Sequence, residues 1–245
     1  MLYDEGGTGR SILLLHGLMG SACTWRRQVP WLRQHGHVHS YDAPGHRRPP
    51  PADPTTEAFV ADLERHAERL GPSIVVGHSM GSLHGLCLAS KRPDLVSGLV
   101  VEDIAPDFRG RTADDWAAMI RQWPQPFADE DAVREFFGDV AGQYFLDSFE
   151  RRDGGWYLHG DISTFEAISQ EWGTRAFWDE WDSVRCPSLL IEGEFGITPP
   201  GQMAEMHARN PMSTHVRVSG AAHLVHDEQP QVYRRAVEEF LGRLQ

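Results

Sequence analysis

Residues 73–81 read Ser-Ile-Val-Val-Gly-His-Ser-Met-Gly, an apolar run followed by a serine between two glycines, and a helix-like segment continues to Lys91. A strand that turns sharply into a helix strains the backbone at the serine and lifts its hydroxyl above the sheet. Bulky side chains at positions 77 and 81 would clash with neighbouring structure. The first amides of the helix point toward the same place. We therefore expect Ser79 to be a nucleophile at the carboxyl end of a buried strand.

Outward from this turn, apolar runs that suit buried parallel strands alternate with segments of helical periodicity. The expected strands are Ser11 to Leu15, His37 to Tyr41, Ser73 to Val76, Ser97 to Val101, Pro187 to Ile191 and Thr214 to Val218. Helical stripes recur at Trp25, Val29 and Leu32, at Phe59, Leu63, Ala67 and Leu70, and from Val232 to Leu244. The alternation predicts an α/β protein with a mostly parallel central sheet and helices on both faces.

The alternation stops between residues 106 and 182, where we expect no strong strand and where tryptophans gather. We interpret this segment as a helical cap inserted at the strand ends, where open α/β sheets bind ligands. The core domain then comprises residues 1–105 and 183–245. The alternative is a set of ordinary surface helices whose tryptophans pack on the sheet.

Length, charge and cysteine content indicate the number of domains and disfavour several kinds of partner. A chain of 245 residues suits one α/β domain, and its formal charge of −12 disfavours nucleic acid and anionic membranes as partners. The three cysteines are odd in number and lack metal-ligand spacing. We see neither a signal peptide nor an apolar run of membrane-spanning length, so a cytoplasmic location is the default expectation.

The Gly77 to Gly81 turn, with its strand before and helix after, resembles the nucleophile elbow of the α/β-hydrolase family, and the resemblance extends from Ser11 to Leu244. His16-Gly17, after the first strand, is similar to the family's oxyanion loop, which implies the amides of Leu18 and Met80 as oxyanion donors. His16 and Gly17 are then expected to border the substrate. Asp42 to His46 resembles the family's D-x-P-G-x-G turn, except that Arg47 replaces the last glycine.

Gly220-Ala221-Ala222-His223 follows the last expected strand, the place from which the family supplies its catalytic histidine. The resemblance implies that His223 takes the proton of Ser79 and returns it to the leaving group. We expect the nearby His226, and His78 within the turn, to be structural.

The third catalytic residue departs from the usual pattern. Most of the family has an aspartate in a G-x-x-D segment, but Gly193 to Gly196 ends in glycine. Glu102 and Asp103 lie one strand earlier, and Asp103-Ile-Ala-Pro resembles the small bacterial serine esterase and thioesterase branch whose acid follows the sixth strand. We favour Asp103, with Glu102 as second choice because its spacing matches the haloalkane dehalogenases. A dyad without an acid, or the use of Glu194, is the remaining alternative.

These residues imply acyl transfer through an acyl-enzyme on carboxylic esters or thioesters with short to medium acyl chains. No metal or cofactor is expected, and the oligomeric state is left open. Substrate-binding side chains are expected among the tryptophans of the cap, namely Trp116, Trp123, Trp156 and Trp178.

Three alternatives stay open at this point. Arg47, Arg48, Arg109 and Arg111 follow two strand ends and either contact the phosphates of coenzyme A or are ordinary surface side chains. The same triad also serves carbon–carbon bond hydrolases and cofactor-free lyases. The third alternative is a hydrolase-like binding protein that lost its acid.

Overall fold

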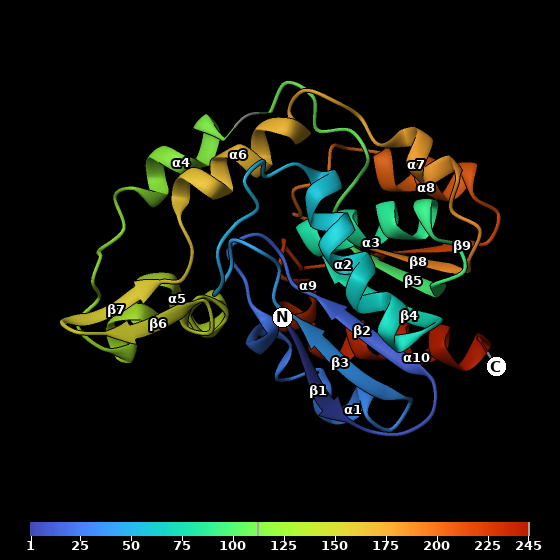
Figure 1. Cartoon of the computed structure of the whole chain (residues 1–245), viewed down its shortest axis with the longest axis horizontal. Helices are drawn as coiled ribbons and strands as arrows, with labels where there is room; N and C mark the ends of the chain where they lie inside the picture. Colours follow the sequence, from blue (N-terminus) through green and yellow to red (C-terminus); the bar gives the residue numbers. More distant parts are fainter. Residues whose placement is uncertain (112, 245) are drawn as a thin grey trace.

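Residues 1–111 and 113–244 are described by the structure, a computed structural model, and within them seven strands form one sheet in the order β1-β3-β2-β4-β5-β8-β9 (Figure 1). Neighbouring strands pair in parallel except β1, which joins β3 antiparallel at the edge. The strands are β1 (Leu2–Gly6), β2 (Ser11–Leu15), β3 (His37–Tyr41), β4 (Ser73–His78), β5 (Val96–Glu102), β8 (Ser188–Gly193) and β9 (Ser213–Val218). The expected α/β-hydrolase architecture is confirmed.

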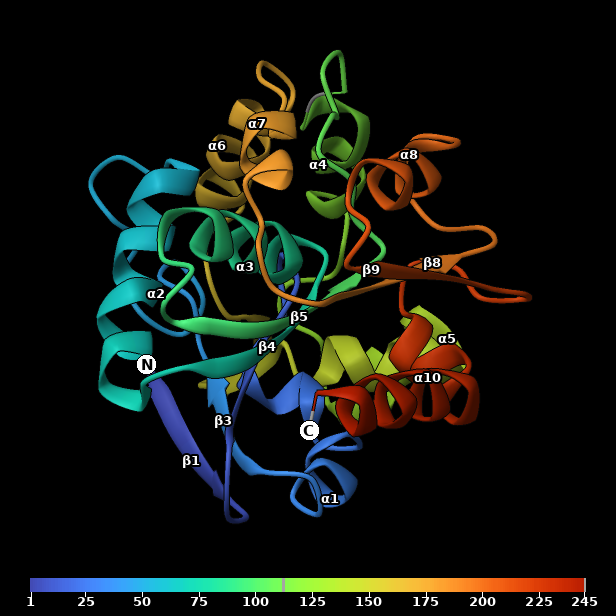
Figure 2. The same ribbon diagram turned by 90° about the vertical axis from the view of Figure 1, so that its right-hand side faces the viewer.

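Helices bury both faces of this sheet, and Figure 2 shows α3 on one side of the strands and α10 on the other. One hydrophobic cluster joins the sheet to α2 (Thr56–Leu70), α3 (Met80–Lys91) and α8 (Gln202–Arg209). A second cluster joins the opposite face to α1 (Val29–Leu32), α9 (Val225–Glu228) and α10 (Pro230–Arg243), with the short 3₁₀ helix η1 (Ala22–Trp25) beside it. The inner strands β2, β4, β5 and β8 are largely apolar on both faces because both faces are covered.

The segment 106–182 lies between β5 and β8 and extends away from α10 (Figure 1). It holds α4 (Asp114–Ile120), α5 (Glu130–Leu146), β6 (Phe149–Arg152), β7 (Gly155–Leu158), α6 (Ile162–Trp172) and α7 (Trp178–Asp182). Most of these elements share a cluster of their own, built around Phe127, Phe149 and Phe165. The last one, α7, instead packs its Trp181 into the sheet cluster that contains α3.

Two parts of this architecture differ from the sequence-based expectation. The β6–β7 hairpin lies where no strong strand was expected, and its turn contains Gly154 at φ 92°, a conformation that glycine adopts without strain. β1 was also missed, because an edge strand with exposed Asp4 and partly exposed Glu5 has no apolar run to reveal it. The six expected strands are present within two residues of their expected ends. Among the described residues, no helix is both long enough and apolar enough to cross a bilayer.

Candidate active site

The turn between β4 and α3 holds Ser79 in a strained conformation, with φ 50° and ψ −118°. Its amide donates to the Glu102 carbonyl (2.9 Å), which ties the turn to the end of β5. A Cβ on Gly77 would lie 2.5 Å from the Cα of Ser82, and a Cβ on Gly81 would lie 2.5 Å from the Leu15 carbonyl carbon. Both positions therefore exclude larger residues, which explains the spelling of the motif.

Ser79 and His223 line the same cavity of about 680 Å³, although β4 and the loop after β9 are far apart in the sequence. Most of the cavity wall is apolar. The described residues that complete it come from the loop after β2, from the ends of β4 and β5, from the segment 106–182 and from the segments after β8 and β9: Leu18, Met19, His78, Ile104, Phe108, Arg111, Trp116, Tyr144, Phe145, Ser169, Trp172, Ile197, Ala222, Leu224 and Glu228. The cavity is large enough to enclose a small-molecule substrate.

Asp103 lies directly behind His223. His223 Nδ1 donates to Asp103 Oδ2 (2.7 Å), and the amides of Gly193 (3.2 Å) and Ile197 (2.9 Å) donate to the same carboxylate. Asp103 is fully buried, so these donors replace its lost hydration. The arrangement fixes the His223 proton on Nδ1 and leaves Nε2 as the free acceptor.

Gly196, which stands where most of the family has its acid, lies against this carboxylate. A Cβ built on Gly196 would lie 2.5 Å from Asp103 Cγ and overlap its oxygens. The Asp103 carboxylate thus fills the space that a side chain at position 196 would need. The Asp103 carboxylate can therefore occupy this place only because residue 196 is glycine.

Glu102 serves a different histidine. Its Oε1 accepts from both the amide (2.9 Å) and Nδ1 (2.8 Å) of His226, and both side chains are buried. Burial alone would lower the pKa of His226, but the charge of Glu102 and its hydrogen bond outweigh burial, so the pKa is raised. Glu194, the other alternative acid, is only partly exposed, and it accepts from the Gly220 amide (2.8 Å) rather than from His223.

The loop that carries His223 is held from two further sides. His78 Nε2 donates to the His223 carbonyl (2.9 Å), and burial lowers the pKa of His78 well below its usual range, so its ring is neutral. Glu228 accepts from the amides of Ala222 and Leu224, the residues on either side of His223. Sequence reasoning missed Glu228, because an acid in a short helix after the histidine carries no distinguishing pattern.

Leu18, in the loop after β2, lines the cavity. Met80 is the first residue of α3, so its amide has no helical acceptor. Gly17 permits a close approach, since a Cβ there would lie 2.6 Å from His78 Nδ1. His16 does not line the cavity. Its Nε2 accepts from the Ala43 amide (3.1 Å) and its Nδ1 donates to the Gly17 carbonyl (2.8 Å), so it supports the loop from beneath.

Besides His78, four neutral histidines are buried around this loop and its neighbours, and we call these four the buried histidines: His16, His46, His84 and His159. Burial lowers the pKa of His16 to about 4 and that of each of the others to about 3. His46 shows how one of them acts. Its Nε2 accepts from the Met19 amide (3.1 Å), and protonation of this nitrogen would place two donors face to face.

The tryptophans expected to bind substrate separate into two groups. Trp116 lines the cavity, and Trp172, which was not among the four, lines it too. Trp123 is buried in the hydrophobic cluster of the segment 106–182, and Trp156 packs against the same cluster. Trp178 packs against the cluster that joins the sheet to α3. None of these three reaches the cavity wall.

Tyr144, from α5, was not expected at the site. Its hydroxyl is buried and has no hydrogen-bond partner among the described residues, although the side chain lines the cavity. Burial raises its pKa above the usual range, so the phenol stays protonated and can donate a hydrogen bond.

The four arginines considered for phosphate contacts are dispersed. Arg111 lines the cavity, and among its described wall residues it is the only arginine or lysine. Arg48 pairs with the partly buried carboxylate of Asp62, and Arg109 pairs with Asp107. Arg47 has φ 60°, the left-handed conformation that suits the glycine of the family motif, and its Nε donates to His159 Nδ1 (3.4 Å).

Comparisons with known proteins agree with this architecture. The model of the alpha/beta hydrolase family matches residues 12–236. The chain is 27% identical over 253 residues to (E)-2-((N-methylformamido)methylene)succinate hydrolase of Acinetobacter baylyi, covering 98% of this chain and 93% of that protein. It is 26% identical over 245 residues to esterase YbfF of Escherichia coli, covering 94% and 92%.

Among solved structures, E-2-(acetamidomethylene)succinate hydrolase superposes with a TM-score of 0.87 at 22% identity, over 98% of this chain and 94% of that one. This likeness shows a shared fold, and the family model covers most of the chain. The chain belongs to the alpha/beta hydrolase family.

Proposed function

We propose that this hydrolase is a serine enzyme that cleaves carboxylic esters or thioesters, with Ser79 as nucleophile, His223 as base and Asp103 as the acid that orients the base. The observation that carries the proposal is the 2.7 Å hydrogen bond from His223 to the buried Asp103, in a cavity that Ser79 also lines. Because Glu102 is engaged by His226, it is the weaker choice for the acid.

In the proposed reaction, His223 Nε2 removes the proton from the Ser79 hydroxyl as its oxygen attacks the carbonyl carbon of the substrate. The amides of Leu18 and Met80 stabilise the resulting oxyanion. His223 then protonates the leaving alcohol or thiol, which departs and leaves an acyl-enzyme. A water activated by the same imidazole releases the acid and returns the proton to Ser79.

The substrate class follows from the cavity wall. Apolar side chains from the segment 106–182, including Trp116, Trp172 and Phe145, favour an apolar acyl group of short to medium length. We further propose that the segment 106–182 acts as a cap over this cavity. The core would then consist of residues 1–105 and 183–245. The cavity wall supports this division, because both parts contribute side chains to it.

A second candidate is hydrolysis of a non-ester bond in a substrate that carries a carboxylate. Arg111 on the cavity wall favours it, as do the names of relatives that act on methylenesuccinate derivatives. Replacing Arg111 by Gln should raise KM for an anionic substrate about tenfold and leave a neutral ester of the same chain length unchanged. Arg109→Gln is the matched control, since Arg109 pairs with Asp107 and does not line the cavity.

A fluorophosphonate probe and a panel of esters and thioesters test the primary proposal. Wild type should be labelled at one serine and should hydrolyse activated aryl esters, whereas Ser79→Ala should do neither. A hydrolase of carbon–carbon bonds would cleave aryl esters poorly. Labelling that persists in Ser79→Ala, or a folded wild type without labelling or turnover, would refute the proposed nucleophile.

A further inference from the structure

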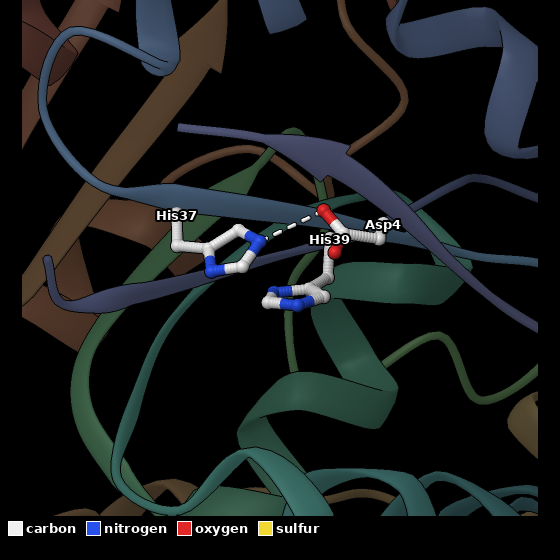
Figure 3. Close-up of side chains that lie close together, drawn as sticks. All are labelled: Asp4, His37 and His39. Atoms are coloured by element: carbon white, nitrogen blue, oxygen red, sulfur yellow. Dashed lines mark hydrogen bonds and ion pairs between the residues drawn. The ribbon is translucent and has the colours of Figure 1, made fainter. Parts of the chain in front are cut away.

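The edge of the sheet remote from the cavity carries a second group of chemically active side chains, Asp4 on β1 and His37 and His39 on β3. Figure 3 shows the three side chains gathered on one face of the two paired strands. Each offers one ligand atom, an imidazole nitrogen or a carboxylate oxygen, and these atoms all lie within 4.8 Å of one another.

Strand geometry explains why these residues meet. His37 and His39 are two positions apart on β3, so both side chains leave the same face. Asp4 is paired with His39 across the antiparallel ladder, and a register shift between Asp4 and Gly6 bends β1 at this point. His37 Nε2 already donates to Asp4 Oδ1 (2.8 Å), and the two imidazole rings lie 4.4 Å apart.

We propose that Asp4, His37 and His39 form a binding site for a divalent cation of the zinc class. Two imidazoles and one carboxylate are a donor set that suits zinc and its neighbours in the first transition row, whereas calcium and magnesium require mostly oxygen donors.

A second observation that points to a ligand is the buried, unpaired ring nitrogen of His39. The side chain is only 8% exposed, and its Nδ1 is buried with no hydrogen-bond partner among the described residues. A buried nitrogen that accepts nothing is costly, and an ordered ion with its bound water would satisfy a histidine in this position.

Small side-chain movements suffice to close the site. Ligand atoms bound to zinc at about 2.0–2.1 Å in a tetrahedron lie about 3.4 Å from each other. Asp4 is 66% exposed and His37 is 35% exposed, so both can rotate toward the more buried His39. One coordination position then remains for water. Such an ion would fasten β1 to β3, and it would stabilise the folded state because the unfolded chain does not bring the three ligands together.

This site is separate from the proposed reaction. His37 is the first residue of β3, whereas Ser79 and Asp103 follow the carboxyl ends of strands parallel to β3. Cation binding at the edge should therefore leave ester hydrolysis unchanged. This separation also distinguishes the edge from His78, Glu102 and His226, the other described group that could hold an ion, which lies beside the cavity.

Titration of the tag-free, chelator-treated full chain with Co²⁺ and Zn²⁺ tests the proposal, with visible absorption, calorimetry and thermal unfolding as readouts. Wild type should bind one cation per chain at the edge and unfold at a higher temperature when saturated. His37→Asn should weaken binding at least about tenfold, and Asp4→Asn, which disturbs an exposed residue only, should weaken it in the same direction.

Two controls make the result specific. His35→Asn removes a neighbouring histidine whose Nε2 faces Glu238 and should bind within about twofold of wild type. His223→Asn removes the histidine of the cavity and should also keep the edge site. The proposal is overturned if wild type shows no saturable binding below about 100 μM. It is equally overturned if His37→Asn and Asp4→Asn bind as tightly as wild type, or if His35→Asn or His223→Asn loses binding to the same extent.

Discussion

The relation between Asp103 and Gly196 allows the acid to be moved from one strand end to the other. Asp103 has φ 44°, a conformation that glycine adopts without strain, so Asp103→Gly should be tolerated by the backbone. Gly196 is not in the left-handed region, so the backbone at 196 accepts an aspartate once the Asp103 carboxylate no longer fills the space. The double variant Asp103→Gly with Gly196→Asp restores the arrangement that most of the family uses.

The magnitudes follow from the role of the acid. Loss of a triad acid lowers kcat by roughly 10³ to 10⁴, or about 4 to 5.5 kcal/mol of transition-state stabilisation, and we expect a loss of this size in Asp103→Gly. Gly196→Asp alone should also be impaired, because the new side chain overlaps the Asp103 carboxylate and sets two negative charges together. Combining the two changes should recover at least about a hundredfold of the activity lost in Asp103→Gly.

Acylation rates with an activated aryl ester, measured by stopped flow, provide the assay, and circular dichroism verifies folding. The matched control is Asp103→Gly with Gly196→Ala, which adds a methyl group but no carboxylate and should recover nothing. The reasoning is refuted if Asp103→Gly retains more than about a tenth of wild-type activity, or if the two double variants are equally active.

Three further predictions concern stability and positioning. When the pH falls from 7.5 to 5.0, each of the buried histidines should lower the free energy of unfolding by about 2 kcal/mol. In the unfolded chain these histidines bind protons near pH 6.5, whereas in the folded chain they stay neutral until the pH reaches their lowered pKa. Stability is therefore complete above pH 6.5 and falls below it. Urea unfolding at the two pH values measures the total loss, and His84→Leu should reduce it by about 2 kcal/mol. An unchanged loss would contradict the assignment. Glu228→Ala leaves the amides of Ala222 and Leu224 without an acceptor and should lower kcat about tenfold with little change in KM. Glu228→Gln keeps an acceptor oxygen and should lose less activity. Equal losses in the two variants would exclude a positioning role. Tyr144→Phe should lower kcat/KM about tenfold if the buried hydroxyl donates to bound substrate. The melting temperature should stay equal or rise, because an unpaired polar group is removed. A fall in melting temperature with unchanged kinetics would show a structural role instead.

The sequence predicts the sheet well because its buried strands are apolar on both faces, as the match at Ser11–Leu15 shows. It predicts the turn at Ser79 because only glycine satisfies the close contacts on either side. The sequence predicts that Glu102 and Asp103 point in different directions, because successive side chains of a strand alternate. It does not predict which of the two carboxylates binds His223, because alternation does not say which one faces the cavity. Contacts between distant segments, such as Tyr144 in the cavity wall, depend on packing that no local pattern records.

Two neighbouring residues at the end of β5 each bind a histidine of the segment that follows β9. Asp103 binds His223 on the cavity wall, and Glu102 binds the buried His226 in α9. The loop is thus fastened at two separate points, and breaking one of them does not allow it to swing away. A variant that lacks the carboxylate behind His223 should consequently keep the loop in place and lose only the charge. The placement of the base therefore does not depend on Asp103 alone.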